Sequence, residues 1–220
     1  MFSPTVVEKI FQEIVITNNC DQIIKFLIFN PSYCNRIDYL EITNDDLFVK
    51  IAPFLGFFTN LNTLIFRKCS SNFNITREWP GSLINLIFSD CSGLIEIPKG
   101  VTDLYFLERL EINYCDNFRD VTPFIGNLKN LKILTMISNE NLKFLRDELG
   151  QLEKLEHCNF NDNNNLTGIP ESISYLKNLS ILSINYCRSI TFISDNFLDK
   201  NYDIFTSMTP ICTVPQPMEI

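Results

Sequence analysis

Three cysteines, Cys69, Cys91 and Cys115, follow one another at intervals of 22 and 24 residues, and His157 is the only histidine of the chain. Thiolates and imidazoles are the ligands of structural zinc, and two neighbouring thiols can form a disulfide. A zinc site built on these cysteines would need a C-x-x-C pair or a nearby histidine, and the sequence has neither. The intervals therefore favour cysteines that fill a repeated structural position, and we expect no metal site.

The residues that could catalyse a reaction are few and poorly placed for it. His157 and Cys158 are adjacent, so on an extended strand their side chains point to opposite faces and cannot form a Cys–His pair. Glu41 and Glu111 lie three of the intervals apart, too far for a pair of catalytic carboxylates. The phosphate-binding patterns G-x-x-x-x-G-K-[ST] and G-x-G-x-x-G are absent. We therefore predict a protein without catalytic residues and without a cofactor.

The intervals belong to a sequence repeat that occurs seven times. Each copy has the pattern L-x-x-L-x-L-x-x-[C/N/D], with other apolar residues in place of some leucines, and successive copies start 24 residues apart except for one that starts after 22. A constant period of this length is typical of solenoids, in which each repeat forms one coil. The pattern residues are Ile37, Leu40, Ile42 and Asp45; Leu61, Leu64, Phe66 and Cys69; Leu83, Leu86, Phe88 and Cys91; Leu107, Leu110, Ile112 and Cys115; Leu131, Leu134, Met136 and Asn139; Leu155, Cys158, Phe160 and Asn163; Leu179, Leu182, Ile184 and Cys187.

The second half of each copy has a wider apolar spacing. After Asn163, for example, apolar residues follow at Leu166, Ile169, Ile173 and Leu176. The whole unit resembles the 24-residue leucine-rich repeat found in plant intracellular immune receptors and in many protist and large-virus proteins. The resemblance covers residues 37 to about 197. It implies an α/β fold, a leucine-rich-repeat solenoid with a curved parallel sheet, and it implies little about function.

The spacing also predicts the elements of each coil. Two apolar residues at period two, such as Leu134 and Met136, predict a short strand with one buried face. The wider spacing that follows predicts a 3₁₀ or helical turn on the convex side. The Cys, Asn and Asp after the strands should satisfy the backbone groups of the turns. We expect these residues in one buried column: Asp45, Cys69, Cys91, Cys115, Asn139, Asn163 and Cys187.

Residues 1–36 depart from the repeat. Thr5 to Glu8 is a T-x-x-E capping box, and the apolar spacing after it predicts a helix over 3–16. A second helix is predicted over about 20–29, where Asn30-Pro31 ends it. Because a solenoid exposes apolar surface at its ends, we expect this segment to be a helical N-terminal cap.

The same segment offers an alternative. Pro4, Val7 and Ile10-Phe11, followed by Asp21-x-Ile23-Ile24, resemble the F-box, a helical module that docks a repeat domain onto a ubiquitin ligase. In that family the Ile-Phe pair lies one residue further from the proline, and a leading leucine and a later tryptophan are missing here. The resemblance implies an adaptor that recruits a substrate to the ligase.

The C-terminal end departs from the repeat as well. The expected apolar positions after Phe197 are occupied by Lys200 and Asp203, and Pro210, Pro215 and Pro217 follow. We therefore predict seven repeats over 37–200 and a tail over 201–220, which either folds back over the last coil or leaves that coil as an association surface.

Composition limits the partners and the compartment. The net charge is −8 and basic clusters are short, which excludes the basic stripe that nucleic acids need. No apolar run reaches the ~18 residues that span a membrane, and the segment after Met1 lacks the basic and apolar parts of a signal peptide. Eight cysteines without disulfide spacing fit a reducing compartment. We predict a cytoplasmic protein with a protein partner, no nucleic acid and no membrane.

Function is expected on the concave face, because the core does not need the side chains there. If the coils stack in register, Ile133 and Ile181 flank His157, and Ile65 neighbours Ile87. Exposed isoleucines among polar and aromatic residues are typical of a protein-binding patch, although a parallel sheet by itself also favours β-branched residues. We predict a non-enzymatic interaction module with these partner-binding residues: Ile65, Arg67, Ile87, Arg109, Glu111, Tyr114, Ile133, Thr135, Ile137, His157, Asn159, Ile181 and Tyr186.

Overall fold

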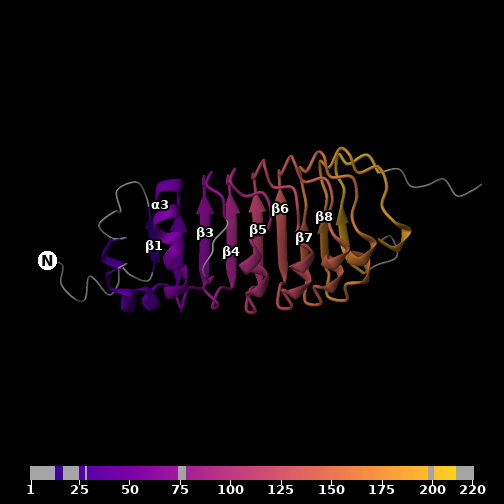
Figure 1. Ribbon diagram of the computed structural model, residues 1–220. Coiled ribbons are helices and arrows are strands. Elements are labelled where there is room, and N and C mark those ends of the chain that lie inside the picture. Colours follow the sequence, from indigo (N-terminus) through magenta and orange to yellow (C-terminus); the bar gives the residue numbers. More distant parts are fainter. Residues whose placement is uncertain (1–12, 17–24, 28, 74–77, 198–200, 212–220) are drawn as a thin grey trace, which may run out of the picture.

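The chain forms a solenoid around one parallel sheet. The computed structural model describes residues 13–16, 25–27, 29–73, 78–197 and 201–211. Within them, nine strands lie in sequence order, and each pairs in parallel with the next (Figure 1). The predicted α/β leucine-rich-repeat solenoid is confirmed. The strands are β1 (Glu13–Ile16), β2 (Tyr39–Ile42), β3 (Thr63–Arg67), β4 (Asn85–Ser89), β5 (Arg109–Asn113), β6 (Ile133–Ile137), β7 (His157–Asn159), β8 (Ile181–Ser183) and β9 (Asp203–Phe205).

Short helical turns return the chain between strands, as the wider apolar spacing predicts. Asn44 caps the α-helix Asp45–Ile51, because its Oδ1 accepts a hydrogen bond from the Leu47 amide at 3.1 Å. The other turns are 3₁₀, and Pro98 and Pro170 directly precede two of them. The turns are η1 (Pro31–Arg36), α3 (Asp45–Ile51), η2 (Ala52–Phe57), η3 (Lys99–Asp103), η4 (Pro123–Asn127), η5 (Asp147–Gln151), η6 (Glu171–Tyr175) and η7 (Asp195–Phe197).

One core runs between the sheet and these turns. Strand residues alternate between buried and partly exposed, so that Leu134 and Met136 are fully buried while Thr135 between them is not. Around the shortened repeat, aromatic rings fill the core: Phe66 stacks on Phe88 with ring centroids 5.3 Å apart and meets Phe73 edge-on at 5.1 Å. Neighbouring coils therefore share their apolar contacts, and no coil is packed alone.

A column of buried residues closes the end of each strand. Asn139 accepts a hydrogen bond from the Cys115 amide at 3.0 Å and donates to the Ile112 carbonyl at 2.8 Å. Asn163 repeats this one coil later with the Asn139 amide at 2.9 Å and the Met136 carbonyl at 2.7 Å. The cysteines of the column are weaker donors, as in the 3.4 Å contact from Cys91 Sγ to the Phe66 carbonyl. We call this column the ladder.

The ladder differs from the prediction at its first position. Asp45 is partly exposed and begins α3. Its Oδ1 accepts the backbone amides of Ser70 at 2.6 Å and Ser71 at 2.7 Å. These amide hydrogen bonds and the Ser70 hydroxyl hold the pKa of Asp45 below its ordinary value, although partial burial opposes the shift. Burying an ionised carboxylate costs far more than burying an amide, so Asp45 serves the next coil from the surface.

From Cys69 onward, the residue before each ladder position adopts a left-handed backbone. The described non-glycine residues with positive φ are Lys68, Asp90, Tyr114, Ser138, Asp162, Tyr186 and Met208, with φ between 53° and 60°. Each strand can turn sharply here, and the amide of the turn donates to the next coil, as from Tyr114 to the Ile137 carbonyl at 2.9 Å.

The N-terminal segment contains a strand where a helix was predicted. Residues 13–16 form β1, whose backbone pairs with β2 in register from Glu13 opposite Tyr39 to Ile16 opposite Ile42. The helix predicted over 3–16 is therefore wrong for its last four residues, because the free edge of β2 offers hydrogen bonds that an extended segment can use. Of the second predicted helix, residues 25–27 are helical. The F-box-like residues before Glu13 lie outside the described residues.

The predicted C-terminal tail contains a further coil. β9 pairs with β8, with Ile204 opposite Leu182, so the described residues 201–211 extend the solenoid. Thr209 takes the ladder position, because its hydroxyl accepts the Cys187 amide at 3.1 Å and donates to the Ile184 carbonyl. The spacing from Cys187 to Thr209 equals that of the shortened repeat. The boundary at residue 200 was wrong because polar residues occupy most of the pattern positions of this coil.

The buried and open positions of β6 should differ strongly in their effect on stability. Leu134→Ala empties a fully buried position between coils and should lower the free energy of unfolding by roughly 2–5 kcal/mol, whereas Thr135→Ala should change it by less than ~0.5 kcal/mol. Urea unfolding of the two variants checks this. Equal midpoints would mean that the two faces of the sheet are assigned wrongly.

Two asparagines that are two residues apart allow a ladder position to be compared with a surface position. Asn163→Ala leaves a buried amide and buried carbonyls without partners, so it should lower the free energy of unfolding by roughly 2–5 kcal/mol. Asn165 makes one exposed hydrogen bond to the Glu140 carbonyl, and Asn165→Ala should cost ~1 kcal/mol or less. A similar loss in both variants, measured by urea unfolding, would contradict the role given to the ladder.

Candidate functional site

The sheet face opposite the helical turns, which we call the open face, carries the predicted partner-binding residues. Strand register arranges its side chains in rows that run along the solenoid. One row contains Tyr39, Thr63, Asn85, Arg109, Ile133, His157, Ile181 and Asp203. The next contains Glu41, Ile65, Ile87, Glu111, Thr135, Asn159, Ser183 and Phe205.

The N-terminal half of the open face is rich in internal ion pairs. Glu41 accepts hydrogen bonds from Arg67 Nε at 2.7 Å and from the Tyr39 hydroxyl at 2.8 Å. Three coils after Glu41, Glu111 pairs with Arg109 Nη1 at 2.8 Å. These charges neutralise one another within the sheet, and at partly exposed positions such pairs add little stability. Their main effect is to hold long side chains in fixed positions.

The C-terminal half is more apolar at its centre. His157 lies directly between Ile133 and Ile181 in the row, as the repeat register predicts. All three side chains are partly exposed, and Thr135 and Ile137 adjoin them on β6. A continuous patch of this kind exposes apolar area to water, and a bound partner could cover that area.

Three asparagines on the open face have a structural role that the sequence did not reveal. The Oδ1 atoms of Asn113, Asn161 and Asn185 accept backbone amides of the next coil, from Ile137 at 3.2 Å, Asn185 at 2.7 Å and Ser207 at 2.6 Å. Their shared position, two residues before the ladder, was the available signal. They form a second, surface line of contacts between coils.

Most predicted partner-binding residues are accessible, with one exception. Ile65 is only 5% exposed, so the prediction of Ile65 as a contact residue is wrong, because its neighbours Glu41 and Ile87 lie on both sides of it. Tyr114 and Tyr186 are 55% and 46% exposed, and both occupy left-handed positions at the strand ends. The others, from Arg67 to Ile181, are partly exposed.

The thiols of the described residues lie in the core. Cys34, Cys69, Cys91, Cys115, Cys158 and Cys187 are buried and unpaired. Burial raises the pKa of Cys34 and Cys187 to about 11 and that of Cys158 further. A hydrogen bond with Cys91, together with burial, raises the pKa of Cys69 and Cys115. Among the described residues no group of three or more His, Cys, Asp and Glu is placed to hold a metal ion.

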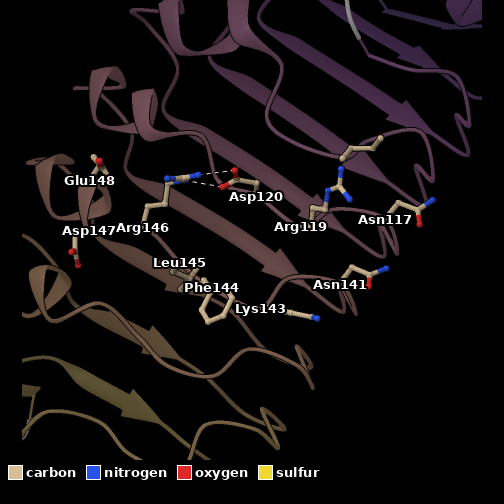
Figure 2. Close-up of a pocket in the computed structure, with 11 residues that line it drawn as sticks. Asn117, Arg119, Asp120, Asn141, Lys143, Phe144, Leu145, Arg146, Asp147 and Glu148 are labelled. Carbon is tan, nitrogen blue, oxygen red and sulfur yellow. Dashed lines mark hydrogen bonds and ion pairs between the residues drawn. The ribbon is translucent and has the colours of Figure 1, made fainter.

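A hollow of about 940 Å³ lies away from the open face, where the chain leaves the ladder and enters η5. Its walls come mainly from two adjacent coils, whose lining residues Figure 2 labels, and Ile95 of the preceding coil completes them. Arg146 spans them by a bidentate pair with Asp120, at 2.8 Å from Nε and 2.7 Å from Nη2, which raises the pKa of Arg146. A second hollow of about 530 Å³ shares Arg119 and Asp120 with the first. The repeat pattern did not predict this hollow. The signal available in the sequence was the pair of basic residues at equivalent repeat positions, Arg119 and Lys143.

The fold resembles solved leucine-rich-repeat structures. The leucine-rich repeat domain of the type III effector XopL matches with a TM-score of 0.57 and 17% identity over 92% of this chain and 80% of that domain. Internalin C2 from Listeria monocytogenes matches with a TM-score of 0.51 and 16% identity over 80% of this chain and 81% of its own. A leucine-rich-repeat protein from Leptospira interrogans matches with a TM-score of 0.50 and 16% identity over 97% and 71%. At such identities the likeness concerns the fold alone.

No protein-family model matches the chain, and no curated protein matches it. The part of the chain that the structure describes contains no helix long and apolar enough to cross a membrane.

The buried thiols should not react in the folded protein. Of the eight cysteines, the six in the core should remain unmodified by dithionitrobenzoate at pH 8, because the folded chain covers their Sγ atoms and the reagent cannot reach them. All eight should react in denaturant. Rapid modification of Cys91 or Cys115 in the native protein, mapped by mass spectrometry, would contradict their place in the core.

Proposed function

We propose that this protein is a cytoplasmic, non-enzymatic interaction module that binds a protein partner on its open face. The observation that carries the proposal is the patch formed by Ile133, His157 and Ile181. Aromatic and apolar side chains that lose water at the centre of an interface dominate binding energy, while charged residues at its margin add specificity. Tyr114 and Tyr186, at the strand ends, would frame this centre.

The form of the surface supports binding over catalysis. The one histidine has apolar neighbours in its row, and the adjacent thiol of Cys158 is fully buried behind the sheet. Glu41 and Glu111 are separated by two isoleucine positions in their row. Rigid strands with ordered side chains also reduce the entropy lost on association.

The comparisons support only the general class. Internalin C2 and the effector XopL share this fold with the present chain, and a solved complex of the receptor TLR13 with single-stranded RNA matches with a TM-score of 0.51. In that receptor the ligand is a nucleic acid. The net charge of −8 favours a protein over a nucleic acid for this chain.

A triple substitution at the patch tests the proposal. Ile133→Ser, Ile137→Asn and His157→Ala together leave the buried positions intact, so the fold should persist while capture of the partner falls by at least about tenfold. Capture is measured by quantitative mass spectrometry of pull-downs. A control variant carries Phe124→Ser, Val49→Asn and Lys177→Ala, three exposed positions away from the open face, and should capture the partner normally.

A truncation separates this proposal from the F-box-type adaptor. Residues 3–35 include β1, which covers the edge of β2, so a truncation should leave β1 in place. A chain that starts at Glu13 keeps β1 and lacks Pro4, Val7, Ile10 and Phe11. If the triple variant captures its partners at full yield while this truncation loses them, the open-face proposal fails and the adaptor takes its place.

A further inference from the structure

The hollow between the coils of Asp120 and Arg146 has charges of opposite sign on its two sides. In Figure 2, Arg119 and Lys143 lie on one side, Asp147 and Glu148 lie on the other, and the Arg146–Asp120 pair lies between them. Among the described residues, no close ion pair involves any of these four outer residues, although the charge of Glu148 contributes to the raised pKa of Arg146. The hollow is therefore polarised, and its outer charges are available to a ligand.

The basic side of the hollow consists of two residues from adjacent coils. Arg119 and Lys143 occupy the same repeat position in adjacent coils, where backbone hydrogen bonds hold the chain in register, as from the Arg119 amide to the Ile95 carbonyl at 2.9 Å. Adjacent strands are ~4.8 Å apart, and like charges at facing positions repel. The carboxylate of Asp120, next to Arg119 in the sequence, is already engaged by Nε and Nη2 of Arg146. An anionic group bound here would relieve this repulsion.

The size and exposure of the hollow indicate the kind of ligand. Small-molecule pockets enclose their ligand in mostly apolar walls. Here Arg119, Lys143, Phe144 and Asp147 are exposed, and Phe144 has 67% of its surface accessible. A purely anionic ligand would meet Asp147 and Glu148, and a purely cationic one would meet the two basic residues. Only a ligand with both charges complements both sides.

We propose that this hollow binds an extended segment of a partner protein that carries an acidic side chain at one end, an apolar side chain in the middle and a basic side chain at the other end. The acidic group pairs with Arg119 and Lys143, the apolar group packs on the Phe144 ring, and the basic group pairs with Asp147 and Glu148. The Arg146–Asp120 pair fixes the two coils that present these groups. This site is separate from the open face.

Fluorescence anisotropy with a synthetic peptide tests the proposal. The labelled probe has two glutamates, a serine spacer with one leucine, and two lysines; two control peptides replace the glutamates or the lysines by glutamines. The full-length protein should bind the probe at least about fivefold more tightly than either control peptide, and added salt should weaken the complex. No saturable binding, or equal binding of the three peptides, would overturn the proposal.

Matched variants assign the binding to the hollow. Arg119→Gln with Lys143→Gln, and Asp147→Asn with Glu148→Gln, should each weaken probe binding by at least about fivefold. Lys177→Gln with Arg188→Gln removes the same charges as the first variant at exposed positions outside the hollow, and should bind normally. If a double variant does not fold by circular dichroism, the single changes Lys143→Gln and Asp147→Asn make the same comparison. Unchanged binding in both hollow variants, or binding of a single-stranded oligonucleotide in place of the peptide, would refute the assignment.

Discussion

The structure depends on satisfying buried backbone groups where each strand ends. A parallel sheet covered on one side by helical turns must bend sharply after every strand, and the turn leaves amides and carbonyls in the core. Partners for these groups come from the next coil, as when Asn139 accepts the Cys115 amide and donates to the Ile112 carbonyl. Each coil is thus completed by its neighbour. The first and last described strands, β1 and β9, also satisfy backbone groups of a neighbouring coil, because they pair with the edges that β2 and β8 would otherwise expose.

The sharp turn after each strand also requires a backbone conformation that costs free energy. A left-handed residue other than glycine costs ~1–2 kcal/mol, yet Lys68, Tyr114 and Tyr186 all adopt this conformation. The conformation directs each amide toward the next coil, and it places the side chain at the edge of the open face. A strained backbone position therefore supplies two exposed tyrosines to the surface that we propose binds the partner. Local strain is acceptable here because hydrogen bonds on both sides of the residue hold it.

The sequence predicted the repeated elements well and the departures from them poorly. Periodicity located β2 to β8 because the core of every coil needs apolar residues at fixed positions. It missed β9 because one apolar residue, Ile204, was enough once β8 offered an edge. It placed Asp45 in the buried ladder because the spacing matched, although a carboxylate is too costly to bury there. The alternating pattern predicted Ile65 as exposed, because alternation shows only which face of the sheet a side chain lies on. Exposure also depends on the neighbouring side chains in the same row, and Ile65 is buried.

The two surfaces differ in how they use register. Stacking coils in register places equivalent repeat positions side by side, so residues far apart in sequence decide the charge of a surface. In the open face, register brings Glu41 near Arg67, and these charges satisfy each other. At the hollow, register brings Arg119 beside Lys143, and Arg146 already occupies the adjacent carboxylate. Evolution of a repeat protein for stability alone would favour alternating signs at such a row. A like-charged pair beside an engaged carboxylate departs from this expectation, and such departures concentrate at sites that serve binding.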